Sequence, residues 1–98
     1  MTKAEKLRLK LAQATKTFMF SDLVTVLSQL GYEMYERAGS RVVFVNEQDS
    51  SNRIHLHKPH PENTIKGGTL KAVKTHLREK GYFDDILTDE KENNDDDL

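Results

Sequence analysis

Cysteine and tryptophan are both absent from this 98-residue chain, and proline occurs only twice. Without cysteine there is neither a disulfide framework nor a thiolate metal site, which is typical of a reducing compartment. The chain also lacks an apolar run long enough to cross a bilayer, and its first residues lack the apolar segment of a signal peptide. We therefore expect a single small cytoplasmic domain with a modest core and no membrane partner.

The net charge of −1 conceals a division of charge along the chain. Residues 84–98 hold eight Asp and Glu against one Lys, a net charge of −7, whereas residues 1–83 carry +6. A basic body predicts a polyanionic partner such as RNA. The acidic segment is typical of a disordered tail that aids solubility, although it could also fold back on the basic body and compete with RNA.

Hydrophobic spacing predicts three helices. Apolar residues recur at three- and four-residue intervals over 3–14, 22–30 and 69–80. Ser21 is a good N-cap for the second of these helices, and Gly31 is the expected stop. The first helix has a narrow apolar stripe, so it must dock on something to persist.

Three strands are expected between the second and third helices. Residues 32–37, 41–45 and 53–57 are rich in aromatic and β-branched residues or alternate between polar and apolar ones. Short links join them, which favours an antiparallel meander. The order α-α-β-β-β-α predicts an α+β fold with a three-stranded sheet, helices on one face and water on the other.

The third strand and the turn after it carry three of the four histidines, in the stretch Arg53-Ile54-His55-Leu56-His57-Lys58-Pro59-His60-Pro61. Alternation directs His55 and His57 toward the uncovered face of the sheet. Imidazoles change charge near neutral pH and so suit proton transfer or anion binding. We take His57, His55 and His60 as candidate catalytic residues. Two other interpretations stay open. The histidines could be ordinary surface residues, or all three could bind zinc, although the cluster has no acidic residue to complete a zinc site.

Two glycine-containing stretches are candidates for phosphate binding. Backbone N–H groups at the start of the last helix could hold a phosphate, although the spacing is not that of a P-loop. In the first hairpin, an arginine after the Gly-Ser pair could clamp a phosphate or lie at the surface. The candidate RNA- or phosphate-binding residues are Arg41, Ser40, Lys58, Lys66, Gly67, Gly68 and Thr69, and no metal or cofactor is expected.

Several of these motifs in this order resemble the HicA family of mRNA interferase toxins. The resemblance covers about residues 20–83, and it implies a fold similar to a double-stranded-RNA-binding domain (dsRBD). It also implies metal-independent endonuclease cleavage of mRNA and neutralisation by a HicB-like antitoxin. On this basis we expect an N-terminal helical extension over 1–17, the domain over 18–83 and an acidic, disordered tail over 84–98. The motifs are Leu30-Gly31-Tyr32, Gly39-Ser40, Leu56-His57-Lys58-Pro59-His60-Pro61, Gly68-Thr69-Leu70, Leu77 and Gly81.

Arg41 stands where the family usually has its catalytic histidine. Proton transfer could have moved to the third strand, with His57 acting beside His55 or His60, while Arg41 and Lys58 stabilise charge on the phosphate. Alternatively, the chain is a non-catalytic RNA-binding module or a degenerate toxin. A purely protein-binding role is a third possibility.

Overall fold

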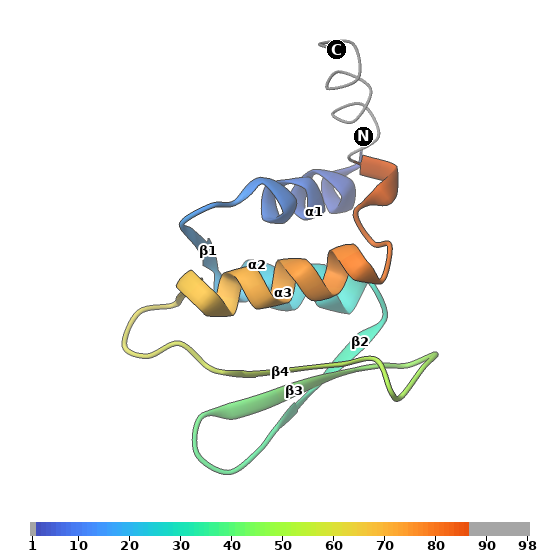
Figure 1. Cartoon of the computed structure of the whole chain (residues 1–98). Coiled ribbons are helices and arrows are strands. Elements are labelled where there is room, and N and C mark those ends of the chain that lie inside the picture. Colours follow the sequence, from blue (N-terminus) through green and yellow to red (C-terminus); the bar gives the residue numbers. More distant parts are fainter. Residues whose placement is uncertain (1, 87–98) are drawn as a thin grey trace.

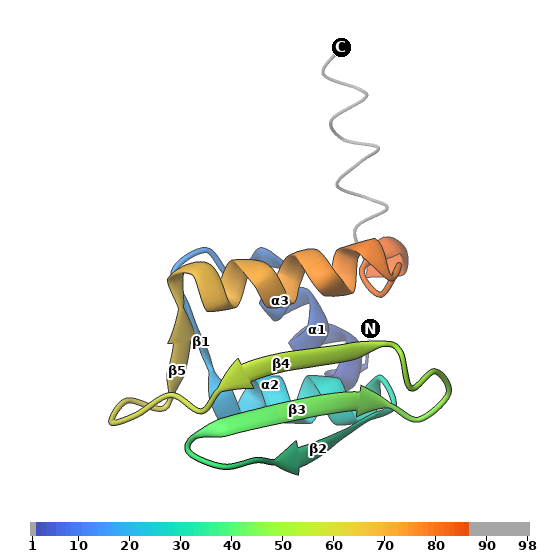
Figure 2. The same cartoon turned by 60° about the horizontal axis from the view of Figure 1, so that its bottom comes forward.

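A computed structural model describes residues 2–86 of the chain, and Figures 1 and 2 show their arrangement. The main sheet is antiparallel with the strand order β2-β3-β4, and β1 pairs separately with β5. The expected α+β class, the meander and the dsRBD-like fold are confirmed. The elements in chain order are α1 (Lys3–Gln13), β1 (Thr17–Met19), α2 (Phe20–Gln29), β2 (Tyr32–Glu36), β3 (Arg41–Asn46), β4 (Arg53–His57), β5 (Thr64–Lys66) and α3 (Gly67–Glu79).

The helices lie on one side of the main sheet, as Figure 1 shows. Ile54 and Leu56 of β4 are buried beneath them, whereas the alternate residues of the strand are exposed on the opposite side. We call this opposite side the outer face. The two sides differ because neighbouring residues of a strand point to opposite faces of its sheet. The predicted division into a covered and an uncovered face is therefore correct.

Residues 17–19 and 64–66 form two short strands that the sequence pattern did not predict. They pair antiparallel, with Phe18 opposite Ile65, and both of these side chains are buried. Three residues are too few to show a period, and the pairing joins segments far apart in the sequence. This small sheet connects directly to the first residues of α2 and α3 (Figure 2).

The prediction of Ser21 as an N-cap is wrong. The N-cap of α2 is Met19, two residues earlier, and its side chain makes no capping hydrogen bond. Because β1 runs straight into the helix, the backbone N–H of Phe20 instead donates to the carbonyl oxygen of Asn63, at 2.7 Å. A tertiary partner thus replaces the side-chain cap.

A buried polar cluster joins one end of the sheet to α3. The Oδ1 atom of Asn52 accepts a hydrogen bond from the Tyr32 hydroxyl at 2.9 Å and lies 2.6 Å from Nε2 of His76. Nearby, the side-chain amide of Asn46 donates to the Tyr82 hydroxyl at 3.1 Å. Because Oδ1 can only accept, the His76 ring must carry a hydrogen on Nε2.

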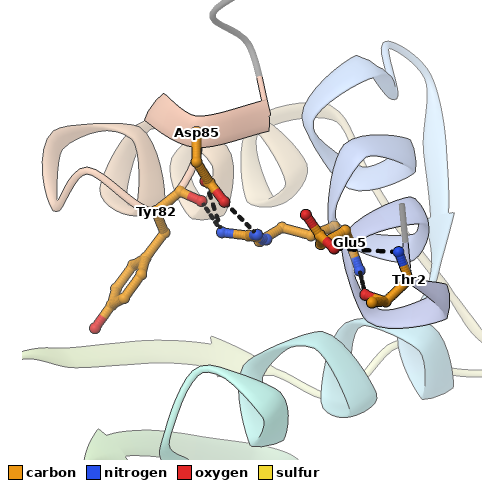
Figure 3. A network of polar contacts seen from close by, with 5 residues as sticks. Thr2, Glu5, Tyr82 and Asp85 are labelled. Carbon is orange, nitrogen blue, oxygen red and sulfur yellow. Dashed lines mark hydrogen bonds and ion pairs between the residues drawn. The ribbon is translucent and has the colours of Figure 1, made fainter.

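Arg8 ties α1 to the residues that follow α3. Its partners Tyr82 and Asp85 are labelled in Figure 3. Its guanidinium donates to the carbonyl oxygen of Tyr82 at 2.7 Å and forms two hydrogen bonds with Asp85, at 3.0 and 2.9 Å. These bonds lower the pKa of Asp85. Leu11 of α1 and Phe83 are fully buried beside this contact. The first helix is therefore an integral part of the core.

The predicted acidic tail falls mostly outside the described residues. Residues 84–86 form a helical turn at the end of the described region, and Ile86 is buried. The remainder, 87–98, lies outside it. The division into an extension, a domain and a tail remains a prediction.

We expect Arg8→Ala to lower the free energy of unfolding by about 1 kcal/mol, because it removes a bond to a backbone carbonyl and a partly exposed ion pair. Thermal unfolding of the full chain measures this change. Lys6→Ala, an exposed position on the same helix, serves as the control and should unfold close to the wild-type temperature. Equal melting temperatures for the two variants would contradict the role of Arg8.

We also expect the chain to lose stability as the pH falls from 7 to 5. Burial, with a smaller contribution from Lys80, lowers the pKa of His76 below its ordinary value of 6.5. Below pH 6.5 His76 therefore binds a proton more readily in the unfolded chain than in the folded chain. The contribution of neutral His76 to the free energy of unfolding is complete above pH 6.5 and declines below it. His76→Gln keeps a donor for Asn52 without titrating. Its melting temperature should fall less over this range than that of the wild type.

Candidate nucleic-acid interface

A hollow of about 520 Å³ lies over the outer face, along β3 and β4. Three arginines and two histidines contribute to its lining, together with apolar residues of the two strands. No carboxylate belongs to this lining in the described part of the chain. We call it the outer-face hollow, and its lining residues are Arg37, Arg41, Val42, Val43, Arg53, His55, Leu56 and His57.

The antiparallel register sets the neighbours within this hollow. Arg41 is the direct cross-strand partner of His57, and Val43 is that of His55. Val43 is only 2% exposed although it lies on the outer face, where its cross-strand partners are Tyr35 and His55. Directly opposed residues have Cβ atoms about 5 Å apart. The predicted proximity of a cation to the strand histidines is therefore realised at Arg41 and His57.

Each arginine of the outer-face hollow is held by a contact near its own turn. The Nε–H of Arg41 donates to the carbonyl oxygen of Ala38 at 3.2 Å, and that of Arg53 to Ser50 at 2.6 Å. The Arg37 guanidinium lies 5.8 Å from the centre of the Tyr35 ring. Within residues 2–86 no carboxylate pairs with any of the three, so their terminal nitrogens can receive an anion.

A second hollow lies beyond the end of β4, and we call it the strand-end hollow. It gathers His57, Lys58, His60, Lys66 and Thr69, together with the proline turn between them. Both lysines already have acidic partners, because Lys58 pairs with Glu36 and Lys66 lies 3.6 Å from Glu62. Exposed pairs of this kind are worth at most about 1 kcal/mol, so a phosphate could displace either carboxylate.

A third depression, which we call the edge groove, runs between β4 and α3. It is lined by residues of both elements, including His55 and His57 from the strand and Gly68, Thr69 and Ala72 from the helix. His57 is the residue that the outer-face hollow, the strand-end hollow and the edge groove share.

Two of the predicted phosphate-binding residues lie apart from these hollows. Gly67 has a positive φ of 57° and borders a different depression with Lys71 and Lys74. Ser40 lines none of the three hollows, and its carbonyl oxygen accepts a hydrogen bond from the backbone N–H of Lys58 at 2.7 Å. At the start of α3, Lys66, Gly68 and Thr69 therefore border hollows that histidines also line, whereas Gly67 does not.

Arg37 and Arg53 line the outer-face hollow but are missing from the predicted site. The sequence pattern could have identified Arg53 as a site residue, because it stands two residues before His55 and so lies on the same face of the strand. Arg37 follows β2, so only the pairing of β2 with β3 brings it next to the others.

Neither a metal cluster nor a membrane span is found in residues 2–86. No group of three or more His, Asp or Glu side chains there is arranged to hold a metal ion. The helices of the same region are too short or too polar to cross a bilayer.

A dsRBD-like domain with arginine and histidine side chains gathered on its open sheet face is the class of protein that these features define. The sequence model of the family described as HicA toxin of bacterial toxin-antitoxin matches residues 20–81. The chain therefore belongs to the HicA toxin family, and its role is that of the toxin in a toxin–antitoxin pair. Comparisons with curated proteins and with solved structures give no match.

Proposed function

We propose that this toxin is a ribonuclease that cleaves mRNA and that the outer-face hollow binds the RNA. The observation that carries the proposal is the set of three arginines and two histidines around one hollow, to whose lining residues 2–86 contribute no carboxylate. Arginine forks match phosphate oxygens in pairs, and their charge favours a polyanion. The match to the toxin family supports an activity harmful to the cell, for which mRNA is a suitable substrate.

The proposed reaction uses the RNA's own 2′-hydroxyl group. This oxygen attacks the adjacent phosphorus, the bond from phosphorus to the 5′-oxygen of the next nucleotide breaks, and a 2′,3′-cyclic phosphate and a 5′-hydroxyl result. One imidazole accepts the proton of the 2′-hydroxyl and another gives a proton to the leaving oxygen. His55 and His57 suit these roles, because residues two apart on a strand lie about 7 Å apart on one face.

In the proposed reaction Arg41 would stabilise the negative charge that builds up on the phosphate. It lies directly across from His57, so both can reach one phosphate group. The strand-end hollow would then receive the neighbouring nucleotide through His60, Lys66 and Thr69, with Lys58 beside them. His57, which borders both hollows, would act at the phosphate between the two nucleotides.

A second candidate function is RNA binding without cleavage. It is favoured by Arg41, which stands at the position where the family usually has its catalytic histidine, because a guanidinium group offers hydrogen-bond donors but no acceptor. Under this hypothesis the arginines hold RNA and the histidines add charge or hydrogen bonds. Salt-sensitive RNA binding with no cleaved product would support it over the ribonuclease.

We expect His57→Ala to reduce the rate of mRNA cleavage at least a hundredfold, as removal of a general acid or base does. The measurement is gel analysis of a defined transcript with purified toxin, together with detection of 2′,3′-cyclic phosphate ends. Thr75→Ala, at an exposed position of α3 away from the sheet, is the control and should cleave normally. A His57→Ala protein that cleaves at the wild-type rate would refute the assignment.

We expect Arg53→Ala to weaken RNA binding and its dependence on salt. For single-stranded nucleic acids, each phosphate contact contributes roughly 0.7 to the slope of the logarithm of the binding constant against the logarithm of the salt concentration. Loss of one contact should therefore reduce the magnitude of the slope by about that amount. Titrations in the His57→Ala background avoid cleavage. Lys71→Ala removes the same charge from an exposed position on α3 outside the outer-face hollow. Equal slopes for the two variants would remove Arg53 from the RNA interface.

A further inference from the structure

The ladder between β3 and β4 determines which backbone groups of β4 face away from the sheet. The N–H of Lys58 donates to Ser40, and the N–H of Asn46 donates to the carbonyl oxygen of Asn52. Hydrogen-bonded pairs alternate along an antiparallel ladder, so the even-numbered residues of β4 bond to β3. The N–H and C=O groups of Arg53, His55 and His57 therefore point outward. Within residues 2–86 no strand pairs with this edge.

This free edge borders the edge groove, which has a volume of about 430 Å³. Figure 2 shows β4 as the strand of the main sheet nearest to α3. On its side the helix presents Gly68, Thr69 and Ala72, all of them exposed and short. A Cβ atom added at Gly68 would meet nothing within 4 Å. The helix surface thus leaves room for an extended chain beside β4.

The charges around the two free edges of the main sheet are opposite. The edge groove includes Arg53, His55 and His57, and no carboxylate lines it among the described residues. In the described part of the chain the other unpaired edge belongs to β2, which carries the exposed carboxylates Glu33 and Glu36, the latter paired with Lys58. A segment with negatively charged side chains therefore matches the β4 edge and is repelled by the β2 edge.

We propose that the antitoxin adds an extended, acidic segment to the free edge of β4 as a fourth strand. The occupant is argued from two observations: the chain belongs to a toxin–antitoxin family, whose resemblance implies a HicB-like protein antitoxin, and the groups around this edge suit an acidic segment. Backbone hydrogen bonds to Arg53, His55 and His57 supply the affinity, as in other cases of strand addition. Side chains on every second residue of the new strand then lie on the outer face, about 5 Å from those of β4.

Strand addition at this edge would block the RNA site directly. Carboxylates of the added strand would pair with the groups that the proposed function gives to phosphates, so antitoxin and RNA would exclude one another. This inhibitory consequence rests on the proposed ribonuclease function. The docking itself does not, because it is argued from the edge, the groove, the charges around them and the family, and none of these requires RNA cleavage.

The first test fills the groove from the helix side. Ala72→Trp places a large ring in the edge groove, and Thr75→Trp places the same ring on another side of α3. The probe is the purified antitoxin encoded beside the toxin gene, and the measurement is its affinity by calorimetry. We expect at least tenfold weaker binding for Ala72→Trp and at most a twofold change for Thr75→Trp, with both variants melting cooperatively. Wild-type affinity for Ala72→Trp would overturn the proposal.

The second test follows backbone amide exchange residue by residue. On antitoxin binding the outward amides of His55 and His57 should gain strong protection, whereas those of Ile54 and Leu56, already bonded to β3, should change less. Unchanged exchange at His55 and His57 would overturn the proposal. Protection of these amides already in the free chain would also overturn the proposal in two cases. If it disappears on dilution, a second copy of the chain occupies the edge. If it disappears on removal of 87–98, the acidic segment occupies the edge.

Cleavage assays on the free toxin separate the two proposals. If the wild-type chain cuts no RNA while the groove and exchange results are as expected, the ribonuclease assignment fails and the docking mode stands. If the chain cuts RNA but Ala72→Trp binds the antitoxin normally, the docking mode fails alone.

Discussion

The register between β3 and β4 is the constraint on which the rest of this structure depends. Buried side chains from both strands point toward the helices and stabilise this register, with Phe44 opposite Ile54 and Val42 opposite Leu56. A slip of one residue would move every buried side chain of β4 to the water side and carry the histidines into the core. The same pairing that buries these apolar groups therefore sets His57 beside Arg41 and directs three backbone units of β4 outward.

Two further connections hold α3 where the site needs it. At its start, the small sheet of β1 and β5 positions the glycine-led first turn next to the end of β4. At its other end, the cluster of Asn52, Tyr32 and His76 joins the helix to the sheet through one buried and one part-buried hydrogen bond. The edge groove lies between these two anchors. Its width thus follows from contacts that involve neither the arginines nor the histidines of the outer face.

The positive groups of the site differ in how they are prepared for a ligand. Lys58 and Lys66 are paired with carboxylates, and a ligand must replace those partners. Arg41 and Arg53 are instead held by backbone carbonyl oxygens, and within residues 2–86 no carboxylate pairs with either. Preorganised, unneutralised guanidinium groups favour an anionic ligand because little has to move or be displaced. Substrate and inhibitor are both proposed to use this property.

The sequence by itself determined the features that depend on local periodicity. Alternation along β4 placed His55 and His57 on the water side, and the apolar spacing of three segments gave the helices to within a few residues. Gly31, the expected stop of the second helix, follows the C-cap of α2 and has a positive φ. The resemblance in order and spacing of motifs also indicated the family that the match over residues 20–81 shows.

Only the tertiary structure decided which of these local features meet. Strand pairing brought Arg37 and Arg53 into the same hollow as the histidines. The turn of α3 placed Gly67 at a different depression from Gly68 and Thr69, because successive residues of a helix point in different directions. The two three-residue strands and the replacement of the Ser21 cap by Asn63 depend on contacts between segments far apart along the chain. Periodicity reports which face of an element is buried, but it carries no information about the element on the other side.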